Sequence, residues 1–153
     1  MQSIKIDLQI TVKDKSIPDK KDFIKWLNCA AKIIPPPKHK NEICIRIIDE
    51  KESANLNKTY RHKPSATNIL SFVYQAEPAE KDDELLGDLA ICAPIIAREA
   101  QQQNKELLTH WAHIVIHGYL HLLSYEHQND QEATKMEQLE VEILQKLGYP
   151  NPY

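Results

Sequence analysis

The stretch LLTHWAHIVIHGYLHLLSYEH, residues 107–127, decides the fold of this chain, because it combines a long helical pattern with closely spaced histidines. Its apolar residues recur every three or four positions, which is typical of a helix packed on a core. The side chains that we expect this helix to bury are Leu107, Leu108, Trp111, Ile114, Val115 and Leu122. The pattern stops at Ser124 and Tyr125, which predicts that the helix ends there and a turn follows.

Three histidines in this stretch have the spacing His-x-x-x-His-x-x-x-x-x-His. His117 and His121 are four residues apart, so a helix places both on one face, about 6 Å apart along its axis. His127 follows the predicted turn and can return toward them. Three neutral imidazoles suit a zinc ion whose fourth position is open to water. The sequence therefore predicts a Zn²⁺ site on His117, His121 and His127, formed by a helix in the C-terminal half and its following turn.

Two further histidines precede the triplet, and helical spacing alone does not exclude them as ligands. His113 stands four residues before His117 and shares its face. His127 places the ion near the other end of the helix, so we expect His113 to lie behind the ligands or at the core edge. We expect His110 at the surface or the core edge. The alternative for the whole cluster is a buried polar stripe whose members are satisfied by hydrogen bonds.

The residue after the first ligand bears on the reaction class. Zinc proteases with the motif His-Glu-x-x-His use that glutamate as a general base. Here the position is Gly118, which argues against peptide hydrolysis. Glycine inside a helix costs about 1 kcal/mol relative to alanine. We therefore expect Gly118 to leave room for a substrate or for a neighbouring backbone.

The rest of the chain predicts an α+β fold in one domain, residues 1–153. We expect strands at 3–11, 42–49, 68–74 and 86–92, and helices at 18–33, 50–60, 94–103 and from 130 to 147, beside the histidine helix. Strands fall mainly in the first 92 residues and helices mainly after them. This order favours a small, mostly four-stranded mixed sheet packed with about five to six helices.

Helix boundaries follow from capping residues. Pro18 suits the first turn of the first helix. Asn104 is expected to cap the start of the histidine helix. Asn129 with Glu132 resembles a capping box for the last helix, and Gly148 suits a left-handed cap after its end.

Composition places the chain among cytoplasmic globular proteins. Hydrophobic residues make up 42%, and no uninterrupted apolar run reaches the length of a membrane span. The alternating N-terminal residues 3–10 indicate a strand and differ from a signal peptide. Three cysteines without a Cys-x-x-Cys pair argue against a disulfide framework and fit a reducing compartment, with each cysteine expected in the core.

Charge is unevenly distributed along the chain. Residues 1–75 hold 14 Lys/Arg and 8 Asp/Glu, a net charge of +6, and residues 76–153 hold 5 and 14, a net charge of −9. A basic half suits a polyanion such as nucleic acid. The alternative, which charge alone favours, is that these lysines only solvate helix and strand faces. The acidic stretch 77–84 predicts a mobile loop.

Residues 117–127, HGYLHLLSYEH, closely resemble the signature of the YbeY family of rRNA maturation endoribonucleases. Other segments are similar in the same order: 56–61 resembles an arginine-bearing helix end, 67–72 a central strand, 86–88 the start of an edge strand, and Met136 with Glu140 a final helix. The resemblance spans roughly residues 40–150. Three positions depart from it, because the family usually has Gly at Ser124, Asp at Glu126 and Asp at Asn68. If position 124 needs a positive φ, serine there costs about 1 kcal/mol.

The resemblance implies cleavage of single-stranded RNA by a zinc enzyme. It implies catalytic roles for Arg61 and His117, and substrate contacts by Arg61, Lys58 and Ser71. It further implies cytoplasmic maturation of the 16S rRNA 3′ end and ribosome quality control, with rRNA, the small ribosomal subunit and its assembly factors as partners. Neither DNA nor a membrane is an expected partner.

Two main hypotheses follow, and a third, weaker one is another zinc hydrolase that acts on peptides or small molecules, with Gly118 counting against peptides. In the first, zinc polarises a phosphoryl oxygen and activates water, while Arg61 holds the scissile phosphate through two hydrogen bonds. Without the resemblance, Arg61 reads as a surface charge at a polar helix end. In the second hypothesis, the chain is a non-catalytic ribosome-assembly factor whose zinc is structural, which the charge asymmetry and Gly118 motivate. An open fourth metal position favours the enzyme. A fourth protein ligand favours the assembly factor.

Overall fold

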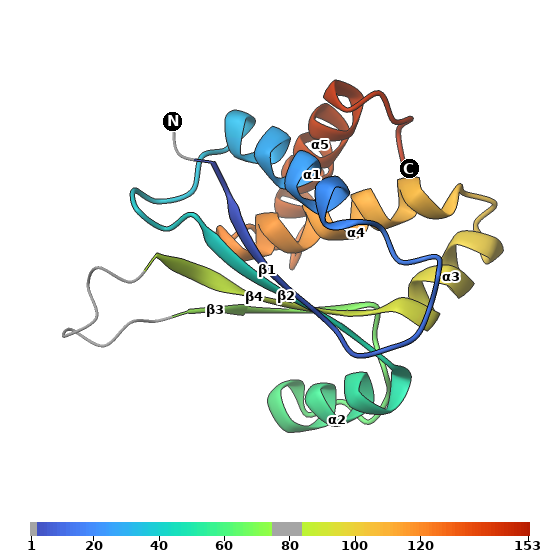
Figure 1. The fold of residues 1–153 in the computed structure, drawn as a ribbon. Coiled ribbons are helices and arrows are strands. Elements are labelled where there is room, and N and C mark those ends of the chain that lie inside the picture. Colours follow the sequence, from blue (N-terminus) through green and yellow to red (C-terminus); the bar gives the residue numbers. More distant parts are fainter. Residues whose placement is uncertain (1–2, 75–83) are drawn as a thin grey trace.

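The computed structural model describes residues 3–74 and 84–153 and contains one four-stranded sheet with helices on both faces (Figure 1). In chain order the elements are β1 (Lys5–Ile10), α1 (Lys20–Ile33), β2 (Glu42–Ile48), α2 (Glu50–Arg61), β3 (Ile69–Val73), β4 (Leu85–Cys92), α3 (Ala93–Gln102), α4 (Leu107–Leu122) and α5 (Asp130–Lys146). The predicted α+β class is confirmed.

The sheet is mixed, as predicted, but β3 lies at one edge and β4 lies between two strands, which reverses the central and edge places expected for residues 67–72 and 86–88. The strand order is β1-β2-β4-β3, with β1 and β4 parallel to β2 and β3 antiparallel to β4. The backbone N–H of Cys92 donates to Asn68 (2.9 Å) and that of Tyr74 donates to Leu86 (3.0 Å). Antiparallel pairing alternates, so the backbone groups of residues 69, 71 and 73 point to the open edge.

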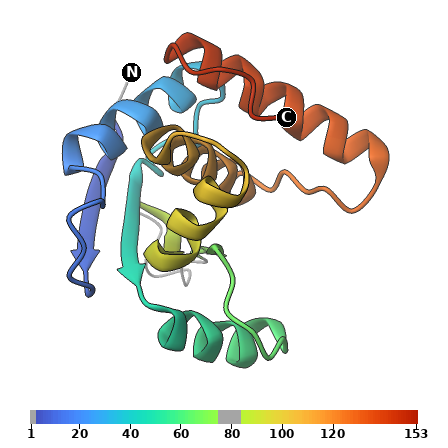
Figure 2. The same cartoon turned by 90° about the vertical axis from the view of Figure 1, so that its right-hand side faces the viewer.

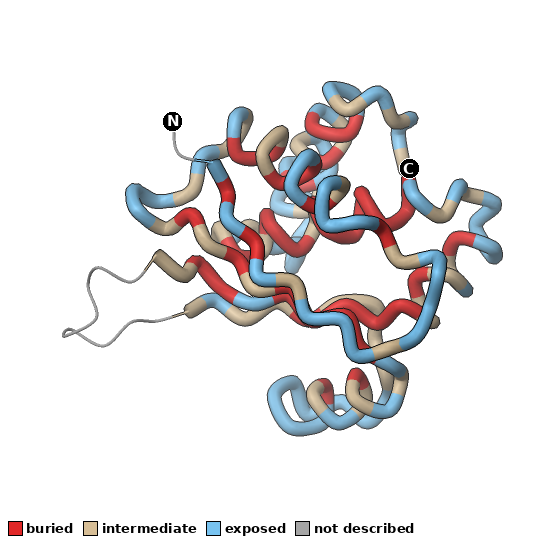
Figure 3. The backbone as a smooth tube through the Cα atoms, in the orientation of Figure 1, coloured by how far each residue is buried: buried red, intermediate tan, exposed pale blue. Residues whose placement is uncertain are grey.

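Helices α1 and α4 pack on one face of the sheet, α5 lies on the same side against these two helices, and α2 lies on the other face (Figures 1 and 2). The β-branched residues Ile43, Ile45 and Ile47 of β2 belong to the larger core on the three-helix side. Ile48 and Leu70 join a smaller core with Leu56 of α2. Buried residues therefore run along the sheet and the helix surfaces that face it (Figure 3).

Helix α4 is the most buried helix of the fold, with 12 of its 16 residues buried. It packs against β3 and β4 as well as α1, α3 and α5. Trp111, Val115 and Leu122 are buried as predicted. The expectation for Leu108 is wrong, because its side chain is 42% exposed. Successive helical positions point about 100° apart, so Leu107 turns toward the core at this first turn and Leu108 turns away.

The predicted role of Asn104 is also wrong. Asn104 has a φ of 54°, and its N–H donates to the carbonyl of Gln101, while Lys105 N–H donates to that of Ala100. These two bonds form a Schellman turn that closes α3. Helix α4 begins instead after Glu106, which caps it without a side-chain bond. Asparagine suits both a helix start and a left-handed helix end, and the left-handed conformation prevails here.

The expected place of Pro18 in the first turn of α1 is wrong, whereas Asn129 caps α5 as predicted and only the return bond of its capping box differs. Helix α1 starts after Asp19, whose N–H donates to the Asp22 carboxylate (3.1 Å), so Pro18 lies just outside its first turn. Before α5, the Asn129 side chain accepts from Glu132 N–H (2.9 Å). The Glu132 carboxylate accepts from the N–H of residue 128 (3.2 Å), one residue before the cap.

Polar residues on α2 fix the loop that leads to β3. The Ser53 hydroxyl donates to the Thr67 carbonyl (2.8 Å) and accepts from the Thr67 N–H (2.9 Å). The Asn57 amide donates to the Ser65 carbonyl (2.7 Å). Ser53 and Asn57 are buried, so these bonds satisfy polar groups that water cannot reach. The end of α2 is therefore held beside the edge strand β3.

All three cysteines are free thiols; Cys92 is buried, whereas Cys29 and Cys44 are only half-buried. Within residues 3–74 and 84–153, no helix combines the length and apolar character of a membrane span. The stretch predicted as a mobile acidic loop falls, for residues 77–83, outside the described part of the chain.

Two glycines allow α4 to approach the sheet. A Cβ atom at Gly118 would lie 2.5 Å from Ile69 Cδ1 and 2.9 Å from Leu89 Cδ2. The space at Gly118 is thus filled by side-chain ends of β3 and β4, which corrects the expectation of a substrate or backbone there. A Cβ at Gly87 would lie 2.4 Å from the carbonyl oxygen of Phe72 and 2.6 Å from Leu122 Cδ2.

We predict that Gly87→Ala destabilises the fold by about 2 kcal/mol, because the paired backbone of β3 cannot move away from a new methyl group. Gly118→Ala should cost less, since the neighbouring side-chain ends can rotate and alanine favours a helix by about 1 kcal/mol. Urea unfolding of both variants measures the difference. A larger loss in Gly118→Ala than in Gly87→Ala would contradict this account of the α4–sheet contact.

Candidate metal site and adjoining cavity

The three predicted ligands meet at the C-terminal end of α4. The Nε2 atoms of His117 and His121 are 3.0 Å apart, and one nitrogen of His127 completes a group whose ligand atoms all lie within 4.8 Å of one another. His117 and His121 are partly buried and His127 is exposed. The predicted spacing therefore brings all three histidines together.

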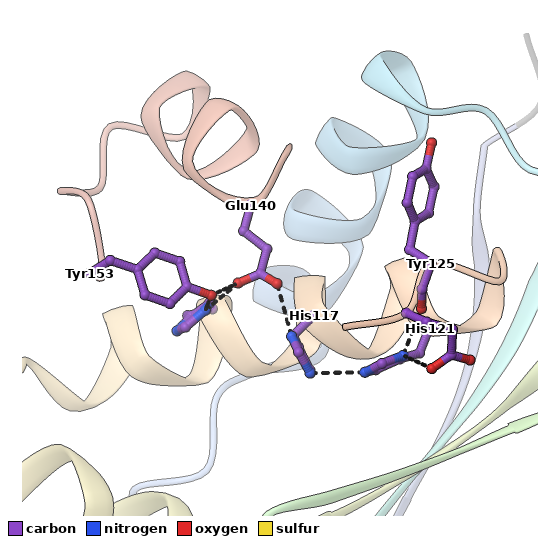
Figure 4. Close-up of polar contacts among 7 residues, drawn as sticks. His117, His121, Tyr125, Glu140 and Tyr153 are labelled. Carbon is purple, nitrogen blue, oxygen red and sulfur yellow. Dashed lines mark hydrogen bonds and ion pairs between the residues drawn. The ribbon is translucent and has the colours of Figure 1, made fainter. Parts of the chain in front are cut away.

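A buried carboxylate fixes the tautomer of His117. The Glu140 side chain of α5 is 1% exposed, and its Oε2 lies 2.8 Å from His117 Nδ1 (Figure 4). Burial raises the pKa of Glu140, but hydrogen bonds from His113 and His117 outweigh burial and bring the pKa to about 2. The carboxylate is thus ionised at neutral pH and accepts from His117 Nδ1, which in a neutral imidazole leaves the lone pair on Nε2.

His121 is held in the same tautomer by the turn that follows α4. Its Nδ1 lies 2.9 Å from the carbonyl oxygen of Tyr125, which can only accept. Burial lowers the pKa of His121, and the neighbouring His117 lowers it further. His121 is therefore neutral, with the lone pair of Nε2 directed toward His117 (Figure 4).

These features fit a bound cation. Two lone pairs facing each other at 3.0 Å are held together by a cation between them, which is either a shared proton or a metal ion. Zinc–nitrogen bonds of about 2.0–2.1 Å in a tetrahedral site separate two nitrogen ligands by about 3.3 Å, close to the separation found here. No other His, Cys, Asp or Glu of residues 3–74 and 84–153 joins the group. The donor set thus leaves a position open.

The turn that delivers His127 contains a strained serine. Ser124 has a φ of 73°; its N–H donates to the His121 carbonyl (2.9 Å), and Tyr125 N–H donates to that of Leu120 (3.0 Å). This is a Schellman turn with serine at the left-handed position that glycine usually occupies. The turn after α5 has the same bonds with Gly148 (φ 86°) at that position, as predicted.

A cavity of about 670 Å³ opens beside the histidines, between the ends of α2 and α4 and the edge strand β3. Arg61 lines it from α2, and one Nη donates to the carbonyl of Ser71 (2.7 Å). The guanidinium also lies 5.2 Å from the centre of the Phe72 ring. Arg61 is therefore anchored to the edge strand in the same cavity as the histidines.

Of the other residues predicted to contact the substrate, one lies in the cavity and one lies outside it. Ser71 lines the cavity, and so does Lys63. Lys58 is exposed on α2 and is not among the residues that line the cavity. Glu126 has a longer side chain than the aspartate that the resemblance led us to expect at this position. It lines the cavity, and one of its oxygens lies 3.9 Å from His121 Nδ1.

Asn68 connects the cavity, through Glu99, to the buried side chain of His110. Its amide nitrogen lies 3.2 and 3.3 Å from the two carboxylate oxygens of Glu99, and Glu99 is 2.9 Å from His110 Nε2. An aspartate at position 68 would place a second carboxylate against Glu99, whereas the amide donates to it. His110 is 3% exposed, so it belongs to the core and is not a surface residue. Burial lowers its pKa.

Sequence reasoning missed the partners behind His117. Glu140 accepts from His113 Nε2 (2.6 Å) and from the hydroxyl of Tyr153 as well as from His117. His113 thus lies behind the ligands, as predicted. Glu140 occupies an apolar stripe with Met136, Ile143 and Leu144, and a carboxylate in such a stripe signals a buried charge that needs partners. Nothing in the sequence pattern indicated Tyr153.

Comparison with known proteins gives consistent results. A family model described as Endoribonuclease YbeY matches residues 7–148. A relative from Nitrosococcus oceani named Endoribonuclease YbeY is 49% identical over 152 residues, which are 99% of this chain and 97% of the relative. The solution structure of TM1509 from Thermotoga maritima is similar with a TM-score of 0.53 at 17% identity, covering 94% of this chain and 91% of that one. At that identity the likeness supports the fold alone.

We predict that Ser124→Gly stabilises the protein by about 1 kcal/mol, because glycine adopts a positive φ without the steric cost of a Cβ. The matched control is Gly148→Ser in the equivalent turn after α5, where a new Cβ has no atom of a non-neighbouring described residue within 4 Å. It should destabilise by a similar amount. Thermal and urea unfolding measure both, and an unchanged or lower stability in Ser124→Gly would show that the turn is not strained.

Proposed function

The chain belongs to the YbeY family of endoribonucleases and is an RNA-cleaving hydrolase, and we propose that it cuts single-stranded RNA with one zinc ion held by His117, His121 and His127. The observation that carries the proposal is the pair of Nδ1 contacts, from His117 to Glu140 and from His121 to the Tyr125 carbonyl, which leave the two Nε2 atoms facing each other. The three-imidazole donor set suits zinc in an open, catalytic site.

When bound, zinc supplies Lewis-acid chemistry, which polarises a phosphoryl oxygen and makes water a stronger nucleophile at neutral pH. Glu140 holds the His117 imidazole in its ligand tautomer. The Tyr125 carbonyl does the same for His121. These residues therefore preorganise the donor atoms before the substrate arrives.

Arg61 is proposed to hold the scissile phosphate. A guanidinium has five N–H donors, and the bond to Ser71 occupies only one nitrogen. The remaining donors can bind two phosphate oxygens and stabilise the charge that develops during cleavage. The contact with the Phe72 ring limits the orientations that the guanidinium can take.

A single strand suits the cavity because its wall is an open sheet edge with the ends of two helices beside it. Ser71 is proposed to contact the substrate at that edge. Lys58, outside the cavity, is proposed to contact phosphates further along the strand, where a positive side chain adds affinity without reading sequence.

The proposed cellular role is maturation of the 16S rRNA 3′ end and ribosome quality control in the cytoplasm, with the small ribosomal subunit and its assembly factors as partners. Membership of an endoribonuclease family supports the RNA cleavage on which this role depends. The alternative, an assembly factor with structural zinc, would require a closed four-ligand site, and only three donors converge in the described part of the chain.

We expect Arg61→Ala to reduce cleavage of single-stranded RNA by about 10² to 10³-fold, because one positioned charge stabilises the transition state by that order. His117→Ala should abolish zinc retention and cleavage together. The matched control is Arg98→Ala, which removes an arginine paired with Glu50 at the surface. The assay uses purified protein whose zinc content has been measured. Full activity in both Arg61→Ala and His117→Ala would refute the proposed site.

Cells that lack this protein should accumulate 16S rRNA with an unprocessed 3′ end, because the proposed substrate is that precursor. End mapping of total RNA measures it. Complementation by the wild-type gene should restore the mature end, and a gene carrying Arg61→Ala should not. Normal ends in the deletion strain would contradict the rRNA role while leaving RNA cleavage in vitro as a separate question.

A further inference from the structure

The carboxylate of Glu140 is held at both oxygens by different partners. Oε2 accepts from His117 Nδ1 (2.8 Å), whereas Oε1 accepts from His113 Nε2 (2.6 Å) and from the hydroxyl of Tyr153. A carboxylate with one bonded oxygen can rotate, but three donors divided between its two oxygens fix its plane. The plane of Glu140 in turn sets the ring orientation of His117.

Tyr153 reaches Glu140 through a segment that leaves α5 and folds back toward α4 (Figure 4). Gly148 reverses the chain, and the Tyr149 hydroxyl accepts from Trp26 Nε1 (3.2 Å), which ties the segment to α1. The Tyr153 ring then packs edge-on against His113, with 5.4 Å between ring centres. Tyr153 as a whole residue is 61% exposed, yet its hydroxyl reaches the carboxylate of a residue that is 1% exposed.

The Tyr153 hydroxyl is a donor throughout the physiological pH range. Burial raises its pKa, and the hydrogen bond to Glu140 raises it further. His113 Nε2 also lies 3.3 Å from this hydroxyl, so the two donors to Oε1 contact each other. Removal of the hydroxyl would therefore loosen both His113 and Glu140 without removing any group that touches the ligand atoms.

We propose that Tyr153 is a positioning residue for the metal ligand His117 and acts through the shared carboxylate of Glu140. The Tyr153 hydroxyl, at the end of the segment after α5, then supports the metal site, although it contributes no ligand. This inference rests on the proposed zinc role of His117. Direct partners of zinc ligands typically change metal affinity by about 10–100-fold when mutated, and an effect one bond further away should be smaller.

The test compares Tyr153→Phe with the wild-type chain by competition for zinc against a chelator. Tyr153→Phe should weaken zinc binding about threefold to tenfold, and Glu140→Gln about 10–100-fold. In metal-free protein, nitrogen NMR of the histidine side chains should show His117 shifting from the pure Nδ1–H tautomer toward a mixture in Tyr153→Phe. This second readout does not depend on zinc or on catalysis.

The matched control is Tyr149→Phe, which also removes one tyrosine hydroxyl from the same segment but breaks the bond to Trp26. It should lower stability and leave both zinc affinity and the His117 tautomer as in the wild type. Wild-type readings in Tyr153→Phe, or equal losses in Tyr149→Phe, would overturn the role of Tyr153. If the wild-type chain binds no zinc, the proposed function fails, and the tautomer measurement alone decides whether Tyr153 positions His117.

Discussion

The burial of α4 is the constraint on which the site depends, because a helix enclosed on nearly all sides must find internal partners for its polar side chains. His110 pairs with Glu99 of α3, and His113 and His117 share Glu140 of α5. Each buried imidazole thus meets a carboxylate from a helix that packs against α4. The histidine stripe thereby favours one docking arrangement of α3 and α5, since a shifted helix would leave a charge buried without a partner.

In two of these histidines, only one of the two ring nitrogens has a hydrogen-bond partner among the described residues. Nδ1 of His110 and Nδ1 of His113 are buried without a hydrogen-bond partner among the described residues. If Nε2 carries the proton and donates to the carboxylate, the unpaired nitrogen is an acceptor, and its desolvation is the cost of placing an imidazole in the core. His117 differs, because the nitrogen opposite its carboxylate partner faces the other ligands. The same imidazole–carboxylate hydrogen bond therefore holds the helices together at His110 and His113, whereas at His117 it orients a metal ligand.

The periodicity of the apolar residues predicted the structural features that depend on local spacing. The elements, the α+β class and the convergence of His117, His121 and His127 follow from apolar repeats and from one helical turn between ligands. The errors arose where one residue type suits two backbone states or where contacts are long-range. Asn104 closes α3 although asparagine also starts helices, and Gly118 makes room for Ile69 and Leu89, which only the sheet topology brings near. Gly148 indicated the chain reversal after α5, but the contact of Tyr153 with Glu140 joins residues that no short-range pattern relates.

Two helix C-termini meet at the cavity, and this sets the electrostatics of the site. Arg61 lies in the last turn of α2, and His121 lies in the last turn of α4. A helix C-terminus carries a partial negative charge, which stabilises a nearby cation by about 0.3–1 kcal/mol and repels an anion. Many phosphate sites use helix N-termini for the opposite reason. Here the backbone favours the guanidinium and a metal ion, and phosphate must be attracted by those cations and by Lys63. The metal ion would therefore do more than activate a nucleophile, since without its charge the end of α4 disfavours the RNA backbone.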